Sequence, residues 1–107
     1  MKGNKTLSML SIAAKAGKVV SGGFLTEKAL QEQKANLVLI ADDASDNTKK
    51  KFTNKCEFYK VPYYISDNSF LLGKSIGKEE RVVLAVTDAG LAKQIINGIN
   101  SSKDLEV

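Results

Sequence analysis

The sequence contains no histidine and no tryptophan, and only one cysteine and one proline. Without histidine, the chain lacks the side chain that most often serves as an acid, a base or a metal ligand near neutral pH. Ser-His and Cys-His nucleophile pairs are excluded for the same reason. The single cysteine, Cys56, cannot form a disulfide within the chain, which favours a reducing compartment. Its place beside Phe52 on a helical apolar face predicts a core residue.

Long apolar runs are missing as well, and no segment is long enough to span a bilayer. No apolar segment with a cleavage site follows the charged start, so we expect a cytoplasmic protein without a membrane partner. The 107 residues predict a single domain over 1–107, with about 101–107 as a frayed tail. We expect a monomer. Sixteen Lys and Arg against twelve Asp and Glu give a net charge of +4, a mild indication of polyanion binding.

Helical and strand-like patterns alternate along the whole chain. Helices are expected over 5–16, over 24–34, from one of several possible N-caps in 42–48 to about Tyr59, over a short segment ended by Gly73, and from Asp88 onward. Apolar runs at 37–41, 61–65 and 82–86, with the β-branched pair at 19–20, predict strands. This alternation predicts an α/β fold, a three-layer α/β/α sandwich around a four-stranded mixed sheet.

The stretch from Lys18 to Lys28 combines a cation, a small-residue turn and a helix start. Gly22 and Gly23 let the backbone approach a ligand closely, and the first N–H groups of the helix favour an anion. Lys28 follows Phe24 by one helical turn, so both side chains project from one outward face. The stretch is therefore a candidate binding site, with an ordinary strand-to-helix connection as the alternative.

The two large apolar residues at the start of this helix are expected on different faces. We place Leu25 with Ala29 on the face that packs into the core. Phe24 has two possible roles, to stack on an unpaired base or to fold back onto Val20 as a hydrophobic staple.

Acidic residues follow the apolar strands and allow a different interpretation. Asp42, Asp43 and Asp88 would hold Mg²⁺ for a phosphate-directed reaction if the fold brought them together. A simpler interpretation makes each an N-cap or a first-turn acid of the following helix.

Several short runs resemble a known family when taken in order. AAKAGKVVSG at 13–22, LVLIADDA at 37–44, VPY at 61–63 and LGKSIG at 72–77 are similar to the ribosomal protein L-seven-Ae family of kink-turn RNA-binding proteins. The similarity covers roughly residues 5–100 and is greatest to the small bacterial, YlxQ-like members. The resemblance implies an α/β/α sandwich that binds kinked RNA carrying a bulge beside tandem G·A pairs.

The contact motif of that family is Gly-x-Asn-Glu-x-x-Lys, supported by a hydrophobic loop before the last strand. Gly22 and Lys28 match its glycine and lysine, while Phe24 and Leu25 occupy the asparagine and glutamate positions. The loop corresponds to 77–81, which is more charged than in the family.

The resemblance thus implies a non-enzymatic protein without cofactor or metal, bound to structured, kink-turn-like RNA such as ribosomal RNA, with the ribosome as a further candidate partner. Its expected RNA-binding residues are Lys18, Gly22, Gly23, Phe24, Lys28, Lys78 and Arg81. Two alternatives are a protein–protein adaptor of the same fold and the Mg²⁺-dependent enzyme.

Overall fold

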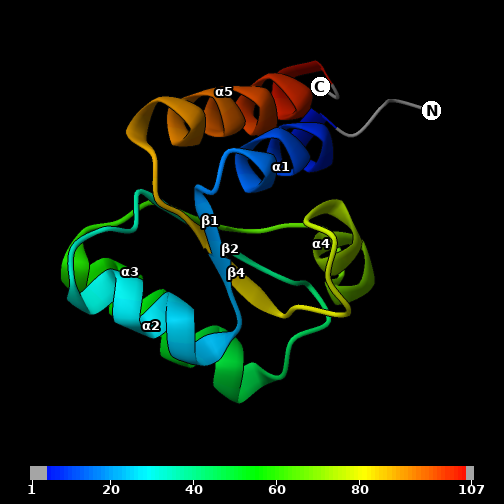
Figure 1. Cartoon of the computed structure of the whole chain (residues 1–107). Helices are drawn as coiled ribbons and strands as arrows, with labels where there is room; N and C mark the ends of the chain where they lie inside the picture. The colour runs from blue at the N-terminus through cyan, green and yellow to red at the C-terminus, as the bar shows by residue number, and fades with distance from the viewer. Residues whose placement is uncertain (1–4, 106–107) are drawn as a thin grey trace.

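The computed structural model describes residues 5–105, with the side chains of 5–101, and confirms the predicted α/β/α sandwich (Figure 1). The helices are α1 (Lys5–Lys15), α2 (Gly23–Gln31), α3 (Asp46–Tyr59), α4 (Ser69–Ser75) and α5 (Ala89–Leu105). The strands are β1 (Val19–Ser21), β2 (Leu37–Ile40), β3 (Tyr63–Ile65) and β4 (Val83–Val86). None of the helices in this described part is both long and apolar enough to cross a membrane.

The four strands form one mixed sheet in the order β1-β4-β2-β3. Strand β4 lies between β1 and β2 and runs antiparallel to both, while β2 and β3 run parallel. The register pairs Val86 with Val19 on one side and with Leu37 on the other. Because β4 is central and reversed, it sets which strand ends meet at each edge of the sheet.

One edge of the sheet gathers the carboxyl ends of β1, β2 and β3 around the start of β4. The backbone N–H of Gly22 donates to the Val83 carbonyl at 2.9 Å, and that of Ala41 donates to the Val82 carbonyl at 2.8 Å. We call this the Gly22 edge. At the opposite edge, which we call the Thr87 edge, the Thr87 N–H donates to the Lys18 carbonyl at 2.8 Å.

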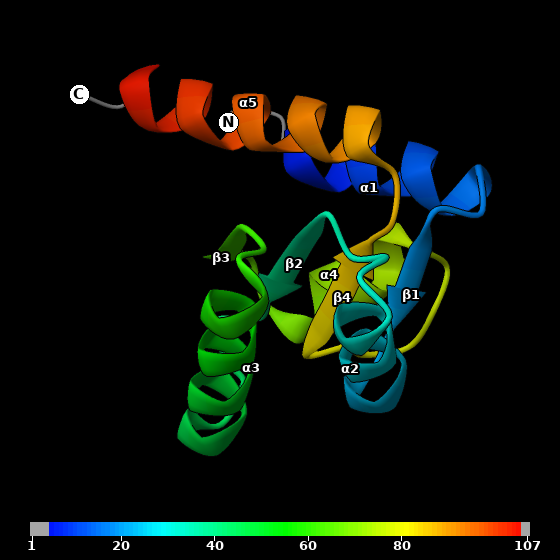
Figure 2. The same cartoon turned by 90° about the vertical axis from the view of Figure 1, so that its left-hand side faces the viewer.

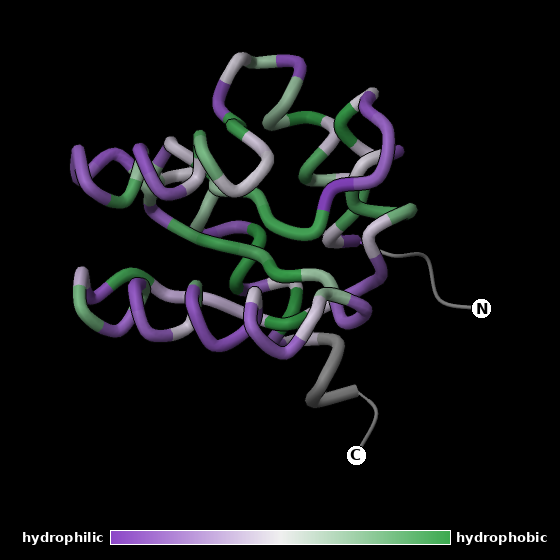
Figure 3. The backbone as a smooth tube through the Cα atoms, turned by 90° about the horizontal axis from the view of Figure 1, so that it is seen from below, coloured by the Kyte–Doolittle hydropathy of each residue, from purple (hydrophilic) through white to green (hydrophobic). Residues whose placement is uncertain are grey.

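Helices cover both faces of the sheet, as Figure 2 shows in the perpendicular view. Helices α1, α4 and α5 pack on the face to which Leu37 and Leu39 point, and α2 and α3 pack on the face of Val38 and Ile40. Both middle strands, β2 and β4, are buried over their whole length. They form the hydrophobic centre of the tube in Figure 3, between more hydrophilic helices.

Three helix ends differ from the sequence expectation. Helix α2 was expected to reach 34 but ends at Gln31. Gly73 does not end α4 but lies buried inside it, and the helix continues to Ser75. A Cβ atom at Gly73 would collide with the backbone carbonyl of Glu79, so this glycine is required for close approach of the following loop. Helix α5 extends to Leu105, beyond the expected start of the tail at about 101, and 106–107 lie outside the described residues.

We predict that Gly73→Ala destabilises the protein, because the new methyl group must displace the backbone of the loop after α4. Overpacking of this kind typically costs about 1–3 kcal/mol, and a rigid carbonyl as the obstacle places this site at the upper end. Thermal unfolding of the variant measures the loss. Gly98→Ala in α5 is the matched control, because its nearest neighbour at 3.4 Å is the flexible side chain of Lys5. Equal melting temperatures for the two variants would contradict the prediction.

Candidate nucleic-acid interface

The turn between β1 and α2 leaves the start of a helix open at the Gly22 edge. Gly22 adopts φ 89° and ψ 159°, a conformation that favours glycine, and no described residue other than its chain neighbours lies within 4 Å of where a Cβ would be. None of the described side chains caps the start of α2, and the first helical bond runs from the Thr26 N–H to the Gly22 carbonyl at 3.0 Å. The first-turn N–H groups before Thr26 therefore have no helical acceptor and carry the positive end of the helix dipole.

The first turn of α2 exposes two large apolar side chains, and for Leu25 this differs from the sequence prediction. Phe24 is 80% exposed, so it does not fold back as a staple on Val20. Leu25 is 45% exposed, and our prediction that it packs into the core is wrong. The buried stripe of α2 instead runs through Thr26, Ala29 and Leu30, because the helix turns that face toward α3 and the sheet.

Hydrogen bonds hold the side chain of Arg81, from the loop after α4, beside this turn. The Arg81 Nε donates to the Ser21 Oγ at 3.1 Å, and its Nη1 donates to the Glu80 carbonyl at 2.9 Å. The Arg81 backbone N–H also donates to the Ser69 carbonyl of α4 at 3.0 Å. These contacts hold the 77–81 loop against the end of β1. Ser21 was missed in the sequence, where nothing distinguished its hydroxyl from other strand-end serines.

The structure brings most of the predicted residues together but separates one of them. Gly22, Gly23 and Phe24 lie with Arg81 at the Gly22 edge, with Lys28 exposed one turn along α2. Lys78 is exposed in the same loop as Arg81, and its N–H donates to the Gly73 carbonyl at 2.8 Å.

Lys18 lies at the Thr87 edge instead, at the other end of β1 from Gly22. An extended chain rises by about 3.3 Å per residue, which puts these two backbones about 13 Å apart. The prediction that Lys18 surrounds the same helix start therefore does not match this arrangement.

The acidic residues do not form the cluster that a Mg²⁺ site would need. Asp88 lies at the Thr87 edge, where its carboxylate accepts from the Leu91 N–H at 2.8 Å and caps α5. Asp43 lies at the opposite edge and accepts from both the N–H and the hydroxyl of Ser69, each at 2.8 Å. These two bonds hold the pKa of the Asp43 carboxyl below its usual range. No group of three potential metal ligands occurs among the described residues.

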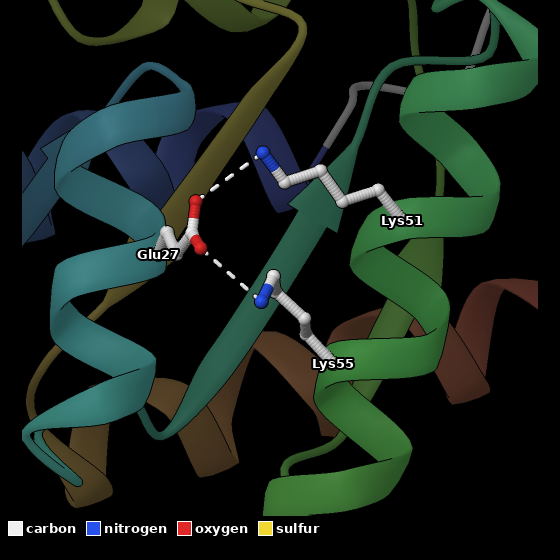
Figure 4. Close-up of polar contacts among 3 residues, drawn as sticks. All are labelled: Glu27, Lys51 and Lys55. Carbon is white, nitrogen blue, oxygen red and sulfur yellow. Dashed lines mark ion pairs between the residues drawn. The ribbon is translucent and has the colours of Figure 1, made fainter.

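An ion-pair cluster joins the two helices on one face of the sheet (Figure 4). Glu27 of α2 contacts the Nζ atoms of Lys51 and Lys55 of α3 at 3.2 and 3.1 Å. Hydrogen bonds from Lys55 and then Lys51 lower the pKa of the Glu27 carboxyl. Two lysines of the basic α3 thus form ion pairs with α2, which the sequence analysis did not predict.

Cys56 is fully buried, in agreement with its predicted place in the core. Burial raises the pKa of its thiol to about 12. The side chain is therefore a neutral apolar group near neutral pH and contributes packing rather than reactivity.

With this geometry in view, comparison with known proteins gives a consistent assignment. The chain belongs to the Ribosomal protein L7Ae/L30e/S12e/Gadd45 family, whose model matches residues 4–96. It is 50% identical to the RNA-binding protein YlxQ of Bacillus subtilis (strain 168), over 91% of this chain and 97% of that protein.

The chain is also similar to a ribosomal protein and to a solved bacterial structure. It is 38% identical to the large ribosomal subunit protein eL30B of Schizosaccharomyces pombe, over 82% of this chain and 77% of that protein. A solved structure of a protein with unknown function from Bacillus halodurans is similar with a TM-score of 0.88 and 39% identity. The match covers 92% of this chain and 99% of that one.

We predict that Leu25→Glu folds normally, because the exposed side chain can direct a carboxylate into water. A surface change of this kind usually alters stability by less than about 0.5 kcal/mol. Thermal unfolding checks it against Ala29→Glu, which puts the same charge on the buried stripe one turn later. The placement of Leu25 is wrong if both variants lose stability to the same extent.

We also predict a pH-dependent contribution of Glu27 to stability. The carboxyl has a lower pKa in the folded chain than its ordinary 4.5, so its contribution is present above that pH and is lost as the pH falls through the folded value. Glu27→Gln should therefore lower the melting temperature near neutral pH, and the difference from the unchanged chain should shrink in acid. Melting curves at several pH values test this. If Glu27→Gln lowers the melting temperature by the same amount at every pH, the ion pairs are not the cause of the loss.

Proposed function

We propose that this protein binds structured RNA through the Gly22 edge, as a monomer associated with translation in the cytoplasm, and recognises kinked duplexes. The main observation behind the proposal is the uncapped start of α2. The hydrogen-bonded 77–81 loop lies beside it, and the exposed Lys28 follows it in the helix. Family membership supports it, because relatives of this chain include an RNA-binding protein and a ribosomal protein.

The physics of RNA helices explains why a kink is the expected target. The major groove of regular A-form RNA is too narrow to admit a helix, so a bulge or kink must open it. A helix start with exposed N–H groups can then meet phosphates and base edges, since the dipole favours negative charge there. Lys28 and Lys78 add cations that neutralise the RNA backbone.

The first turn of α2 differs from the family motif in the side chains that would face base edges. Phe24 and Leu25 cannot make the hydrogen bonds of the asparagine and glutamate at those positions. Recognition would therefore depend more on the shape of the kink, on backbone N–H groups and on stacking than on hydrogen bonds to guanine.

A protein partner at the same surface is the second candidate function. The exposure of Phe24 and Leu25 side by side favours it, because apolar side chains at an exposed edge are also found at protein interfaces. The two functions differ in their response to salt: binding to RNA weakens steeply as salt rises, whereas apolar association does not.

The deciding experiment is a binding titration with a kink-turn RNA and its straightened duplex control. We expect tighter binding to the kinked RNA, with affinity falling roughly 10- to 100-fold between 50 and 200 mM salt for about three phosphate contacts. Lys28→Ala should weaken binding and reduce the slope of log affinity against log salt by about 0.7–0.9. Thermal unfolding should show no matching loss of stability.

Lys93→Ala is the matched control, because Lys93 is exposed on α5, away from the Gly22 edge. If both lysine variants weaken binding equally, only diffuse charge is involved and the proposed site is incorrect. Equal affinity for kinked and straight RNA would overturn the proposal of kink recognition.

A further inference from the structure

Helices α1 and α4 contact each other on one face of the sheet and enclose a groove that the proposed RNA site does not use. The groove consists of two adjoining hollows of about 300 and 380 Å³, which share Ser11 of α1 and Lys74 and Ser75 of α4 in their lining. We call it the α1/α4 groove. We propose that it binds a helix of a partner protein, and that the first turn of this helix is acidic. The inference goes beyond the proposed function, because it concerns a second surface and a protein ligand.

The shape of the groove suits a helix. Its floor consists of small side chains: Ser8, Ser11 and Ala14 line it from one stripe of α1, and Ser75 lines it from α4. Small side chains at a contact allow two helix axes to approach closely, and a groove between helices is a common docking site for an amphipathic helix. The lining of α1 runs from position 7 to position 15, a rise of about 12 Å. This length accommodates about two turns of a docked helix.

Each of the two helices places one large apolar side chain beside the groove. Ile12 follows the lining residue Ser8 by one turn of α1 and is 53% exposed. Phe70 precedes the lining residue Lys74 by one turn of α4 and is 58% exposed. The ammonium of Lys74 lies 5.8 Å from the centre of the Phe70 ring, so a cation and an apolar surface are adjacent at this rim. A partner helix with apolar residues along one stripe would bury both side chains.

The charge of the groove has one sign. Neither α1 nor α4 contains an aspartate or a glutamate, whereas α2 and α3 on the other face of the sheet contain Glu27, Asp46 and Glu57. The cations in the lining are Lys15 and Lys74. Both are exposed, and neither forms an ion pair with another residue in the described part of the chain. Acidic side chains of a partner would therefore meet two available ammonium groups and no opposing carboxylate in the lining.

The direction of the two helices favours a protein helix over an RNA segment. Helix α1 ends at Lys15 and α4 ends at Ser75, and both residues line the same hollow. The carboxyl ends of helices carry partial negative charge, and the amino end of a helix carries partial positive charge together with its preferred acidic side chains. An incoming acidic first turn thus matches the helix ends through its backbone and the two lysines through its carboxylates. An RNA segment would bring phosphates alone to the same helix ends.

The test uses three synthetic helical peptides of about 16 residues, a length at which a helix can form in water. The first peptide has glutamates in its first turn and a stripe of leucines. The second has the same residues with the glutamates moved to the last turn, and the third has lysines in place of the glutamates. We expect the first peptide to bind most tightly and to shift the backbone amide resonances of Ser11, Lys74 and Ile76. Equal affinities for the three peptides, or shifts confined to the Gly22 edge, would overturn the inference.

Two variants separate binding in the groove from diffuse attraction. Lys74→Glu should weaken binding of the first peptide roughly 3- to 30-fold and strengthen binding of the third, because it reverses one exposed ion pair. Ser11→Phe fills the shared floor without changing the charge and should abolish binding of the first peptide. The control is Lys50→Glu, the same charge change on an exposed lysine of α3, which should leave both affinities unchanged. Equal effects of Lys74→Glu and Lys50→Glu would contradict a specific site.

Thermal unfolding of each variant shows whether it folds, and Lys74→Glu tests the inference even if Ser11→Phe does not. A single-stranded RNA that shifts the groove amides and displaces the first peptide would show that the occupant is RNA and overturn the inference. Self-association that Ser11→Phe abolishes would identify a second copy of this chain as the occupant, with the same consequence. The affinity of Lys74→Glu for kinked RNA should equal that of the unchanged chain. If the first peptide binds the groove but kinked RNA is not preferred over straight RNA, the proposed function fails alone.

Discussion

The reversed direction of β4 between β1 and β2 is the constraint on which the rest of the structure depends. It brings the start of β4 to the carboxyl ends of the other strands, so the open start of α2 and the loop before β4 become neighbours at the Gly22 edge. The same reversal sends the carboxyl end of β4 to the opposite edge. Asp88 and Asp43 are thereby separated, and the geometry that Mg²⁺ chemistry would need is absent from the described chain.

Close backbone approach and one arginine position the loop beside that helix start. The backbone of Glu79 lies against Gly73, where any side chain would collide, and Arg81 reaches Ser21 at the end of β1. A loop held in this way loses less conformational freedom when a ligand binds, so more of the contact energy remains as affinity. Arg81 thus has a positioning role through its guanidinium in addition to any contact with RNA.

Local charges matter more for the proposed interface than the net charge of +4. Lys51 and Lys55 belong to the basic helix α3, yet both are paired with Glu27 of α2. Lys28 has no such partner among the described residues, and it lies one turn from the open end of α2. Phe24 adds an exposed aromatic ring one turn before Lys28, so the first turns of α2 combine a cation with a flat apolar surface.

The sequence by itself determined the fold class and the turn around Gly22, because both depend on local patterns: alternating apolar runs, glycine in a positive-φ turn, and a helix start after it. Only the tertiary structure decided which side chains share a surface. Lys18 and Gly22 are close in sequence, but an extended strand carries them to opposite edges, whereas Arg81 and Ser21 are distant and touch. Leu25 illustrates the same limit. The buried face of a nine-residue helix depends on the angle at which the helix packs against α3 and the sheet. The apolar periodicity of the helix does not predict that angle.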